Sequence, residues 1–157
     1  MKPRLYLETT IPSYLTAWAS RDLIVAAHQQ LTKDWWQIRR DVFEICISQF
    51  VVDEAAAGDP DAARDRLEIL KSLPLLNISE SVLLLASSLL RPDIIPEKAA
   101  RDAAHIAVSA VHGIEYLMTW NCTHLANAMI IKKVQAICTQ HGFACPVICT
   151  PEELMEG

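Results

Sequence analysis

The sequence predicts an α/β protein of three layers, with helices on both faces of a mostly parallel central sheet. Short apolar segments alternate with helical segments along the whole chain, which is typical of this fold class. The length of 157 residues suits one compact domain, and no linker, repeat or low-complexity run divides the chain. We therefore expect a single domain over residues 1–157.

Five short apolar segments are expected to form the strands of the sheet. They are Pro3–Leu7, Phe43–Ile47, Leu75–Ile78, Tyr116–Thr119 and Pro146–Cys149. The carboxyl ends of parallel strands meet at one edge, which is where open α/β sheets bind ligands. The residues expected at this edge are Glu8, the turn region Ser48–Glu54 and Asn121.

The expected helices lie between these strands and begin or end at recognisable cap residues. They cover Arg21–Val42, Gln49–Ala57, Pro60–Ser72, Glu80–Leu90, Glu97–His112 (opened by Pro96) and Ala128–His141. Their expected N-caps are Ser20, Ser48, Asp59 and Ser79. The first helix carries an apolar stripe at Ala27, Leu31, Trp35, Ile38 and Val42, which predicts the face that packs on the core.

Glycine is scarce in this chain, and each one has a simple role. Gly58, Gly113 and Gly142 follow expected helices as C-caps, and Gly157 is the last residue. No glycine remains for a loop that cradles phosphate groups. The sequence therefore excludes the dinucleotide-binding fingerprint and the P-loop.

The composition indicates a folded protein without a membrane anchor. Apolar residues make up 52% of the chain, and no apolar run reaches the ~18 residues that a membrane span requires. The first residues, MKPRLYLETT, lack the apolar core of a signal peptide. We expect a cytoplasmic protein with no membrane partner.

The five cysteines do not form a recognisable metal or disulfide framework. They include no CxxC pair, and their odd number favours reduced thiols. A zinc site made of Cys122, His124 and His105 is an open alternative, although its ligands lack paired spacing.

The formal net charge of −5 argues against nucleic-acid binding through a broad basic surface. If the protein acts on nucleic acid, another group must supply positive charge at the site. A divalent metal ion is the natural candidate.

Four polar residues stand at strand ends or early in helices: Glu8, Glu54, Asp102 and Asn121. Each has a simple structural interpretation, such as dipole complementation for Asp102 or turn capping for Asn121. Their common edge favours a shared site, because converging carboxylates repel one another unless a cation neutralises them. Mg²⁺ prefers such oxygen ligands, and a bound metal can promote phosphodiester hydrolysis.

The helix at Asp102 also carries a polar stripe. Its members are Lys98, Asp102, His105, Ser109 and His112. The spacing places them on one line, which we interpret as a seam facing solvent or a partner. His105 is then a possible substrate contact and not a general base.

At these residues the sequence resembles the PIN domain, the nuclease fold of virulence-associated toxins from bacterial toxin–antitoxin pairs. The resemblance covers nearly the whole chain. It is carried by "YLETTIPSYL", "VVDEAAAGDPDAA", "DAAHIAVSAVHG" and "LMTWNCTHLAN", each of which is weak alone.

The resemblance implies a Mg²⁺- or Mn²⁺-dependent ribonuclease. By this analogy Glu8 and Asp102 hold the metal most directly, and Glu54 holds a water or helps to activate the nucleophile. Asn121 orients water or ligand. Thr10 and Thr119 are nearby hydroxyls, and His105 and His124 are possible substrate contacts. The resemblance also implies a homodimer and an antitoxin protein that covers the acidic groove.

Two residues depart from the family pattern. The first position is commonly Asp but here is Glu8, whose extra methylene shifts the carboxylate. The fourth is often Asp but here is Asn121, which removes one negative charge. These departures support an alternative: a PIN-fold module that binds RNA or protein with little catalysis.

Two further interpretations follow from single residue types. An aspartyl-phosphate hydrolase of similar layered fold would need an Asp-x-Asp pair after the first strand, and "LETT" offers none. Trp18, Trp35 and Trp36 are candidate interface anchors, with Trp35 more plausible as a core residue.

Overall fold

The computed structural model describes all 157 residues and contains one five-stranded sheet in which every pairing is parallel. Its order is β3-β2-β1-β4-β5. The strands are β1 (Arg4–Leu7), β2 (Glu44–Ser48), β3 (Leu75–Leu76), β4 (Tyr116–Met118) and β5 (Val147–Cys149). The predicted fold class is confirmed, and each expected strand forms within two residues of its predicted bounds.

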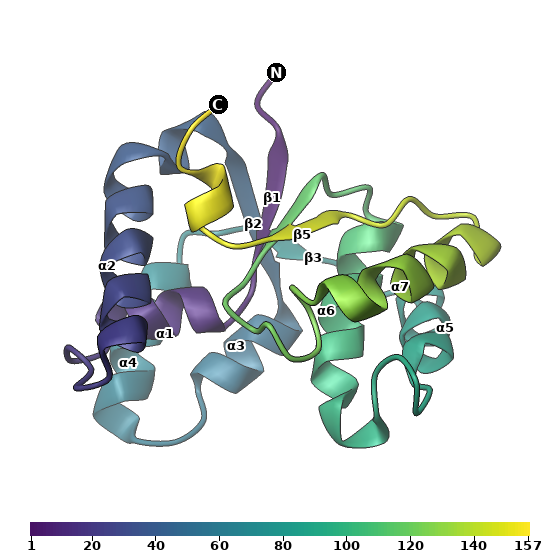
Figure 1. Cartoon of the computed structure of the whole chain (residues 1–157), viewed down its shortest axis with the longest axis horizontal. Coiled ribbons are helices and arrows are strands. Elements are labelled where there is room, and N and C mark those ends of the chain that lie inside the picture. Colours follow the sequence, from purple (N-terminus) through teal and green to yellow (C-terminus); the bar gives the residue numbers. More distant parts are fainter.

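Seven α-helices and three short 3-10 helices connect and cover the strands. The α-helices are α1 (Thr10–Thr16), α2 (Leu23–Ile38), α3 (Gln49–Ala55), α4 (Pro60–Leu70), α5 (Glu80–Leu89), α6 (Ala100–Val111) and α7 (Ala128–Gln140). The 3-10 helices are η1 (Arg40–Val42), η2 (Glu97–Ala99) and η3 (Glu152–Leu154). Figure 1 shows α1, α2 and α4 on one side of the sheet and α5, α6 and α7 on the other.

The order of the strands creates a topological switch point beside the central strand. From β1 the chain moves to β2 and β3, and it then returns to β4 on the opposite side of β1. Leu7 at the end of β1 pairs with Met118 at the end of β4. Glu8 and Thr119 follow these two residues directly, so both lie at the topological switch point where such sheets bind ligands.

Helix α6 is buried on almost every side. All residues from Ala103 to Ala110 are buried, because small alanines let the helix pack closely against α5. The prediction of a polar seam facing solvent is therefore wrong: His105 and Ser109 are fully buried. Lys98 is not in this helix at all but in η2.

The segment before β2 differs most from the sequence prediction. Helix α1 was not expected, since seven residues that include Pro12 show no helical period. Helix α2 begins after Asp22, whose carboxylate accepts from the backbone N–H groups of Ile24 and Val25. Asp22 and not Ser20 is the N-cap, and residues 40–42 form the separate turn η1.

The predicted apolar stripe on α2 is only partly correct. Trp35 is buried as expected, but Ala27, Ile38 and Val42 are exposed. The buried face includes Gln29, whose amide bonds to the backbone of residues 18 and 20 at 3.2 and 2.9 Å. Hydrogen bonds of this kind satisfy the buried polar group and hold the α1–α2 connection.

Two of the three remaining N-caps, Asp59 and Ser79, agree with the sequence prediction. The Asp59 and Ser79 side chains accept from the first turns of α4 and α5, and Gly113 ends α6 with φ of +66°. Ser48 occupies the N-cap position of α3, but its side chain makes no capping hydrogen bond.

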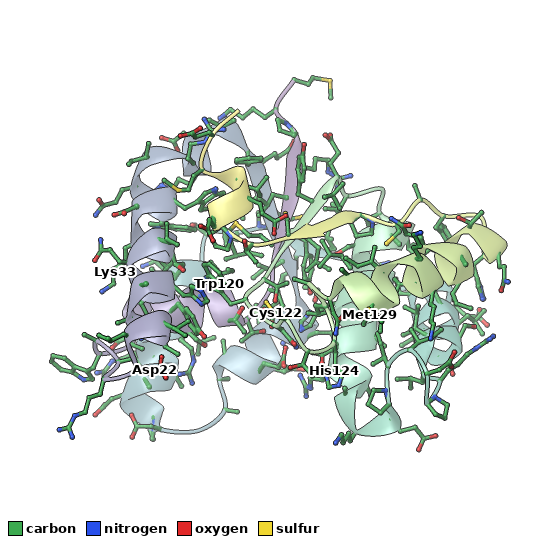
Figure 2. The ribbon with its side chains drawn as sticks, viewed as in Figure 1. Asp22, Lys33, Trp120, Cys122, His124 and Met129 are labelled. Atoms are coloured by element: carbon green, nitrogen blue, oxygen red, sulfur yellow. The ribbon has the colours of Figure 1, made fainter.

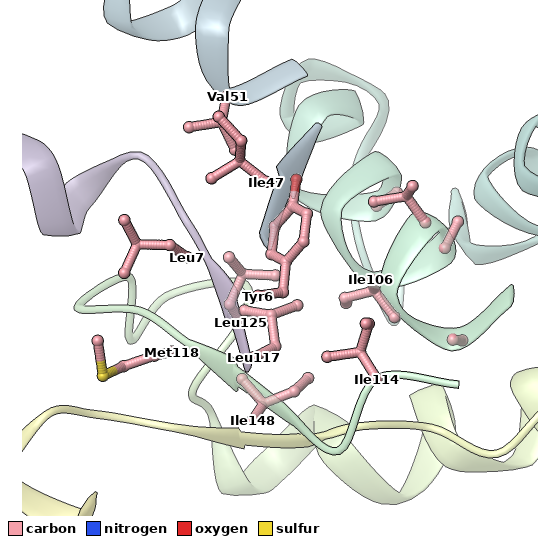
Figure 3. Packing of buried hydrophobic residues seen from close by; sticks show 14 of the residues in the cluster. Tyr6, Leu7, Ile47, Val51, Ile106, Ile114, Leu117, Met118, Leu125 and Ile148 are labelled. Carbon is pink, nitrogen blue, oxygen red and sulfur yellow. The ribbon is translucent and has the colours of Figure 1, made fainter. Parts of the chain in front are cut away.

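The apolar core lies on both faces of the three central strands. Figure 3 shows the side chain of Tyr6 extending away from Leu117 and Ile148, with its hydroxyl pointing toward the end of β2. Tyr6 is fully buried, so its hydroxyl requires a partner inside the protein. No helix combines the length and apolar composition needed to cross a bilayer.

Candidate functional site

Glu8 is a buried carboxylate at the end of the central strand. Its side chain is held through Oε1, which accepts from the hydroxyls of Thr10 and Thr119 at 2.5 and 2.6 Å. The backbone N–H of Thr10 donates to the same oxygen at 3.1 Å. Three donors on one oxygen fix the position of a carboxylate that is only 3% exposed.

Glu54 lies in the last turn of α3 and points toward the same edge. Its Oε1 accepts from the Thr9 hydroxyl at 2.8 Å and contacts Nε2 of His105 at 2.5 Å. Burial raises the pKa of the Glu54 carboxyl, but the hydrogen bonds from His105 and Thr9 and the nearby charge of Arg101 outweigh it. The net effect is a pKa below the ordinary value of 4.5, so Glu54 is ionised at neutral pH.

Glu8, Glu54 and His105 form the most compact cluster of potential metal ligands. One ligand atom from each lies within 4.8 Å of the others. Two carboxylates this close repel each other when both are charged, and oxygen-rich clusters of this size suit a divalent cation. The group can therefore bind a metal ion; the geometry does not identify which one.

Behind His105 a chain of hydrogen bonds extends into the core. The ring Nδ1 contacts the Tyr6 hydroxyl at 2.6 Å, and that hydroxyl contacts Ser48 Oγ at 2.7 Å. Burial is the largest cause of a Tyr6 pKa well above its ordinary value of 10.0. Tyr6 therefore stays a neutral phenol.

Asp102 lies outside the compact cluster but beside Glu54. Its Oδ2 contacts Nδ1 of His124 at 3.1 Å. A pocket of about 470 Å³ connects these side chains, and it is lined by Glu54, Lys98, Ala99, Ala100, Arg101, Asp102 and His124. Figure 2 shows His124 on the loop that follows β4. Glu54 thus belongs to both the buried cluster and the open pocket.

The three carboxylates share one pattern of hydrogen bonding. In each, protein donors hold a single oxygen: Oε1 of Glu8, Oε1 of Glu54 and Oδ2 of Asp102. No side-chain or backbone donor of the protein reaches the second oxygen. Each carboxylate is therefore oriented and still has one oxygen able to coordinate a cation.

Asn121 acts as a turn former in this structure. Its Oδ1 accepts from the backbone N–H groups of Thr123 and His124, both at 3.1 Å. This bonding shapes the loop after β4 and places His124 against Asp102. The amide carbonyl is engaged by the backbone, which is the simple structural role that the sequence already allowed.

Of the four expected substrate contacts, one is open to the pocket. The His124 side chain is 24% exposed, whereas Thr119 and His105 are fully buried. The Thr10 hydroxyl donates to Glu8 and accepts from the Trp120 N–H. Thr10, Thr119 and His105 therefore orient the carboxylates and do not face a ligand directly.

The alternative zinc site does not assemble. The His105 ring bonds to Glu54 and Tyr6, and Cys122 is exposed. His124 contacts Asp102 instead. No cluster of potential metal ligands includes a cysteine.

Three supporting residues escaped the sequence reasoning: Tyr6, Thr9 and Ser48. Tyr6 belongs to an apolar strand pattern, and Thr9 and Ser48 resemble ordinary turn and cap residues. The only signal in the sequence was the presence of hydroxyl residues where β1 and β2 end. These are "TT" after Glu8 and Ser48 before α3.

Comparison of the chain with models of protein families and with curated proteins finds no match to either. The resemblance to PIN domains therefore stays a prediction. The fold and the acidic cluster are established by the structure alone.

Proposed function

We propose that this chain is a Mg²⁺- or Mn²⁺-dependent endoribonuclease of PIN type that hydrolyses RNA phosphodiester bonds. The observation that carries the proposal is the set of Glu8, Glu54 and Asp102, each with one oxygen held and one free. They lie at the switch-point edge of a parallel sheet, where substrates of such folds bind.

The donor set fits a hard divalent cation. Carboxylate oxygens are the ligands that Mg²⁺ and Mn²⁺ prefer, and the free oxygens of Glu8 and Glu54 would hold the ion. A bound cation supplies positive charge for a phosphate oxygen and lowers the pKa of water.

The protein's own residues supply orientation and charge. Thr10 and Thr119 hold Glu8, while Thr9 and His105 hold Glu54. Asp102 lies on the pocket side, where its free oxygen can accept a proton from an incoming nucleophile. Preorganised groups of this kind do not have to reorient during the reaction.

Two basic residues lie at the mouth of the pocket. Lys98 and Arg101 line it together with Asp102, and both are exposed. In a chain of net charge −5, these two side chains place positive charge beside the acids of the pocket, where it can attract the RNA backbone.

The direct test is cleavage of single-stranded RNA by metal-loaded protein. Glu8→Gln, Glu54→Gln and Asp102→Asn should each lower the rate by about 100-fold, the effect of losing one group that stabilises transition-state charge. Asp53→Asn is the matched control, because Asp53 is exposed, adjacent to Glu54 and bonded only to Gln49. If EDTA-treated protein and Asp102→Asn cut as well as the wild type, the activity belongs to a contaminant.

A second function is favoured by Asn121. Its carbonyl is engaged by two backbone N–H groups, so the fourth position contributes neither charge nor a free ligand. The alternative is a PIN-fold module that binds RNA or protein with weak catalysis. Calorimetry with Mn²⁺ separates the two, since absence of binding at millimolar metal would favour the module.

The proposal includes three partners. They are RNA as the substrate, a second copy of the chain in a homodimer, and an antitoxin protein. Exposed apolar groups support a protein partner, because large exposed patches mark interaction sites. Trp18, Leu23 and Ile24 are 96%, 86% and 69% exposed around the α1–α2 connection.

A further inference from the structure

We propose that His105 is a positioning residue for Glu54, and that Tyr6 and Ser48 hold its ring in the tautomer that donates from Nε2. The inference deepens the proposed function, because it assigns a role to three residues beneath the same site. His105 then supports a carboxylate ligand and is not itself a metal ligand.

The geometry is a continuous chain of buried polar atoms. It runs from Ser48 Oγ to the Tyr6 hydroxyl at 2.7 Å, then to His105 Nδ1 at 2.6 Å. From His105 Nε2 it reaches Glu54 Oε1 at 2.5 Å. Ser48, Tyr6 and His105 are all fully buried, so water has no access to these groups.

The direction of donation follows from the donor inventory. An ionised carboxylate only accepts, so Nε2 must carry the proton that faces Glu54. In a neutral ring Nδ1 is then an acceptor, and the phenol of Tyr6 donates to it. Ser48 donates in turn to the Tyr6 oxygen. Every group in the chain from Ser48 to Glu54 is satisfied with a single direction of donation.

The Ser48 hydroxyl takes part in this hydrogen-bond chain and not in the usual N-cap bond of α3. Ser48 occupies the N-cap position of α3, where a serine normally accepts from the first turn of the helix. Here it makes no such bond, and its hydroxyl contacts Tyr6 instead. The helix that carries Glu54 thus begins at the residue that starts the hydrogen-bond chain.

The same engagement argues against His105 as a ligand. A histidine binds a metal through an unprotonated nitrogen, but Nε2 donates to Glu54 and Nδ1 accepts from Tyr6. Coordination would require both contacts to be abandoned. Supporting hydrogen bonds that orient a ligand are a common feature of metal sites.

Two substitutions separate the nitrogens of His105. In His105→Gln the amide nitrogen lies close to the original Nε2 and can still donate to Glu54. In His105→Asn the shorter amide reaches toward Tyr6 but not Glu54. We expect His105→Gln to bind Mn²⁺ within about threefold of the wild type and His105→Asn to bind about tenfold more weakly. Equal affinities of the wild type and His105→Asn would overturn the assignment.

Two spectroscopic measurements on the intact wild-type chain do not depend on how the variants fold. Long-range ¹H–¹⁵N correlation should show that Nε2 of His105 is protonated and Nδ1 is not. Protonation of Nδ1 would contradict the proposed direction of the hydrogen bonds from Ser48 to Glu54. Pulsed electron paramagnetic resonance of the Mn²⁺-loaded protein should show no directly bound nitrogen. A ¹⁴N coupling from His105 would refute the positioning role while leaving a metal nuclease intact. If the wild-type chain does not bind Mn²⁺ at all, the proposed metal-dependent nuclease is wrong. The role of His105 in positioning Glu54 would then be tested only by the protonation state of its two ring nitrogens.

Discussion

The hydroxyl of Thr119 donates a hydrogen bond of 2.6 Å to Oε1 of Glu8, although the two residues are 111 positions apart in the chain. Glu8 directly follows β1 and Thr119 directly follows β4, and these two strands are neighbours in the sheet. This contact crosses the switch point and joins the two halves of the fold at the proposed site.

Loss of the Thr119 hydroxyl should weaken metal binding. Thr119→Val keeps the buried shape but removes one of three donors from Glu8. Because a hydrogen bond to a charged group contributes roughly 1.5–3 kcal/mol, we expect Mn²⁺ affinity to fall at least about tenfold by calorimetry. Thr119→Ser is the matched control and should bind like the wild type. An unchanged affinity in Thr119→Val would mean that Glu8 does not contact the metal.

Charge reversal at the pocket mouth should affect RNA binding and not metal binding. In a Glu8→Gln background, which slows cleavage, Lys98→Glu with Arg101→Glu should lower affinity for single-stranded RNA. The slope of log affinity against log salt should become shallower by about 1.4, as expected for two lost phosphate contacts. Fluorescence anisotropy over a salt series measures both quantities. Lys132→Glu with Lys133→Glu on α7 matches the charge change, and an equal effect there would indicate general electrostatics.

Replacing the exposed apolar side chains Trp18 and Leu23, around the α1–α2 connection, should change the oligomeric state. Trp18 and Leu23 are 96% and 86% exposed, so polar substitutions there should not disturb the core. Trp18→Ser with Leu23→Ser should convert a dimer into a monomer in analytical ultracentrifugation. Ile38→Ser, at the other end of α2 and 68% exposed, is the control. A wild-type chain that sediments as a monomer would contradict this prediction.

Alkaline pH should destabilise the protein partly through Cys149. Burial is the main cause that raises the pKa of this thiol from 9.0 to about 12. The unfolded chain therefore releases the proton first, so stability is fully present below pH 9 and falls as pH rises from 9 toward 12. Cys149→Ala should flatten this decline in the free energy of unfolding, measured by urea titration. Cys122→Ala, at an exposed site, should not.

Much of the fold was predictable because its signals are local. Alternating apolar segments located five strands, and Asp59, Ser79 and Gly113 marked helix ends through their own backbone bonds. Helix α1 was missed because a seven-residue segment has no measurable period. The start of α2 was misplaced by two residues, since Ser20 and Asp22 are both good caps and only Asp22 bonds to the first turn.

The candidate site was only partly predictable. The positions of Glu8, Glu54 and Asp102 at one edge follow from the parallel order of strands and helices. The grouping of Glu8 and Glu54 with His105, and not with Asp102, does not follow from it. His105 seemed to belong to a solvent-facing stripe, because a helical period shows which residues share a face but not what covers that face.

By itself the sequence determined the fold class, the edge at which the acids gather and the absence of a phosphate-binding glycine loop. These depend on residue period, cap chemistry and glycine count, which are properties of short segments. Only the tertiary structure decided which oxygen of each carboxylate is held and that His105 is buried on Tyr6 and Glu54. The contacts that Glu8, Glu54 and His105 make with other elements join residues 45 to 111 positions apart, and they exist only once the strands have paired and α6 has packed.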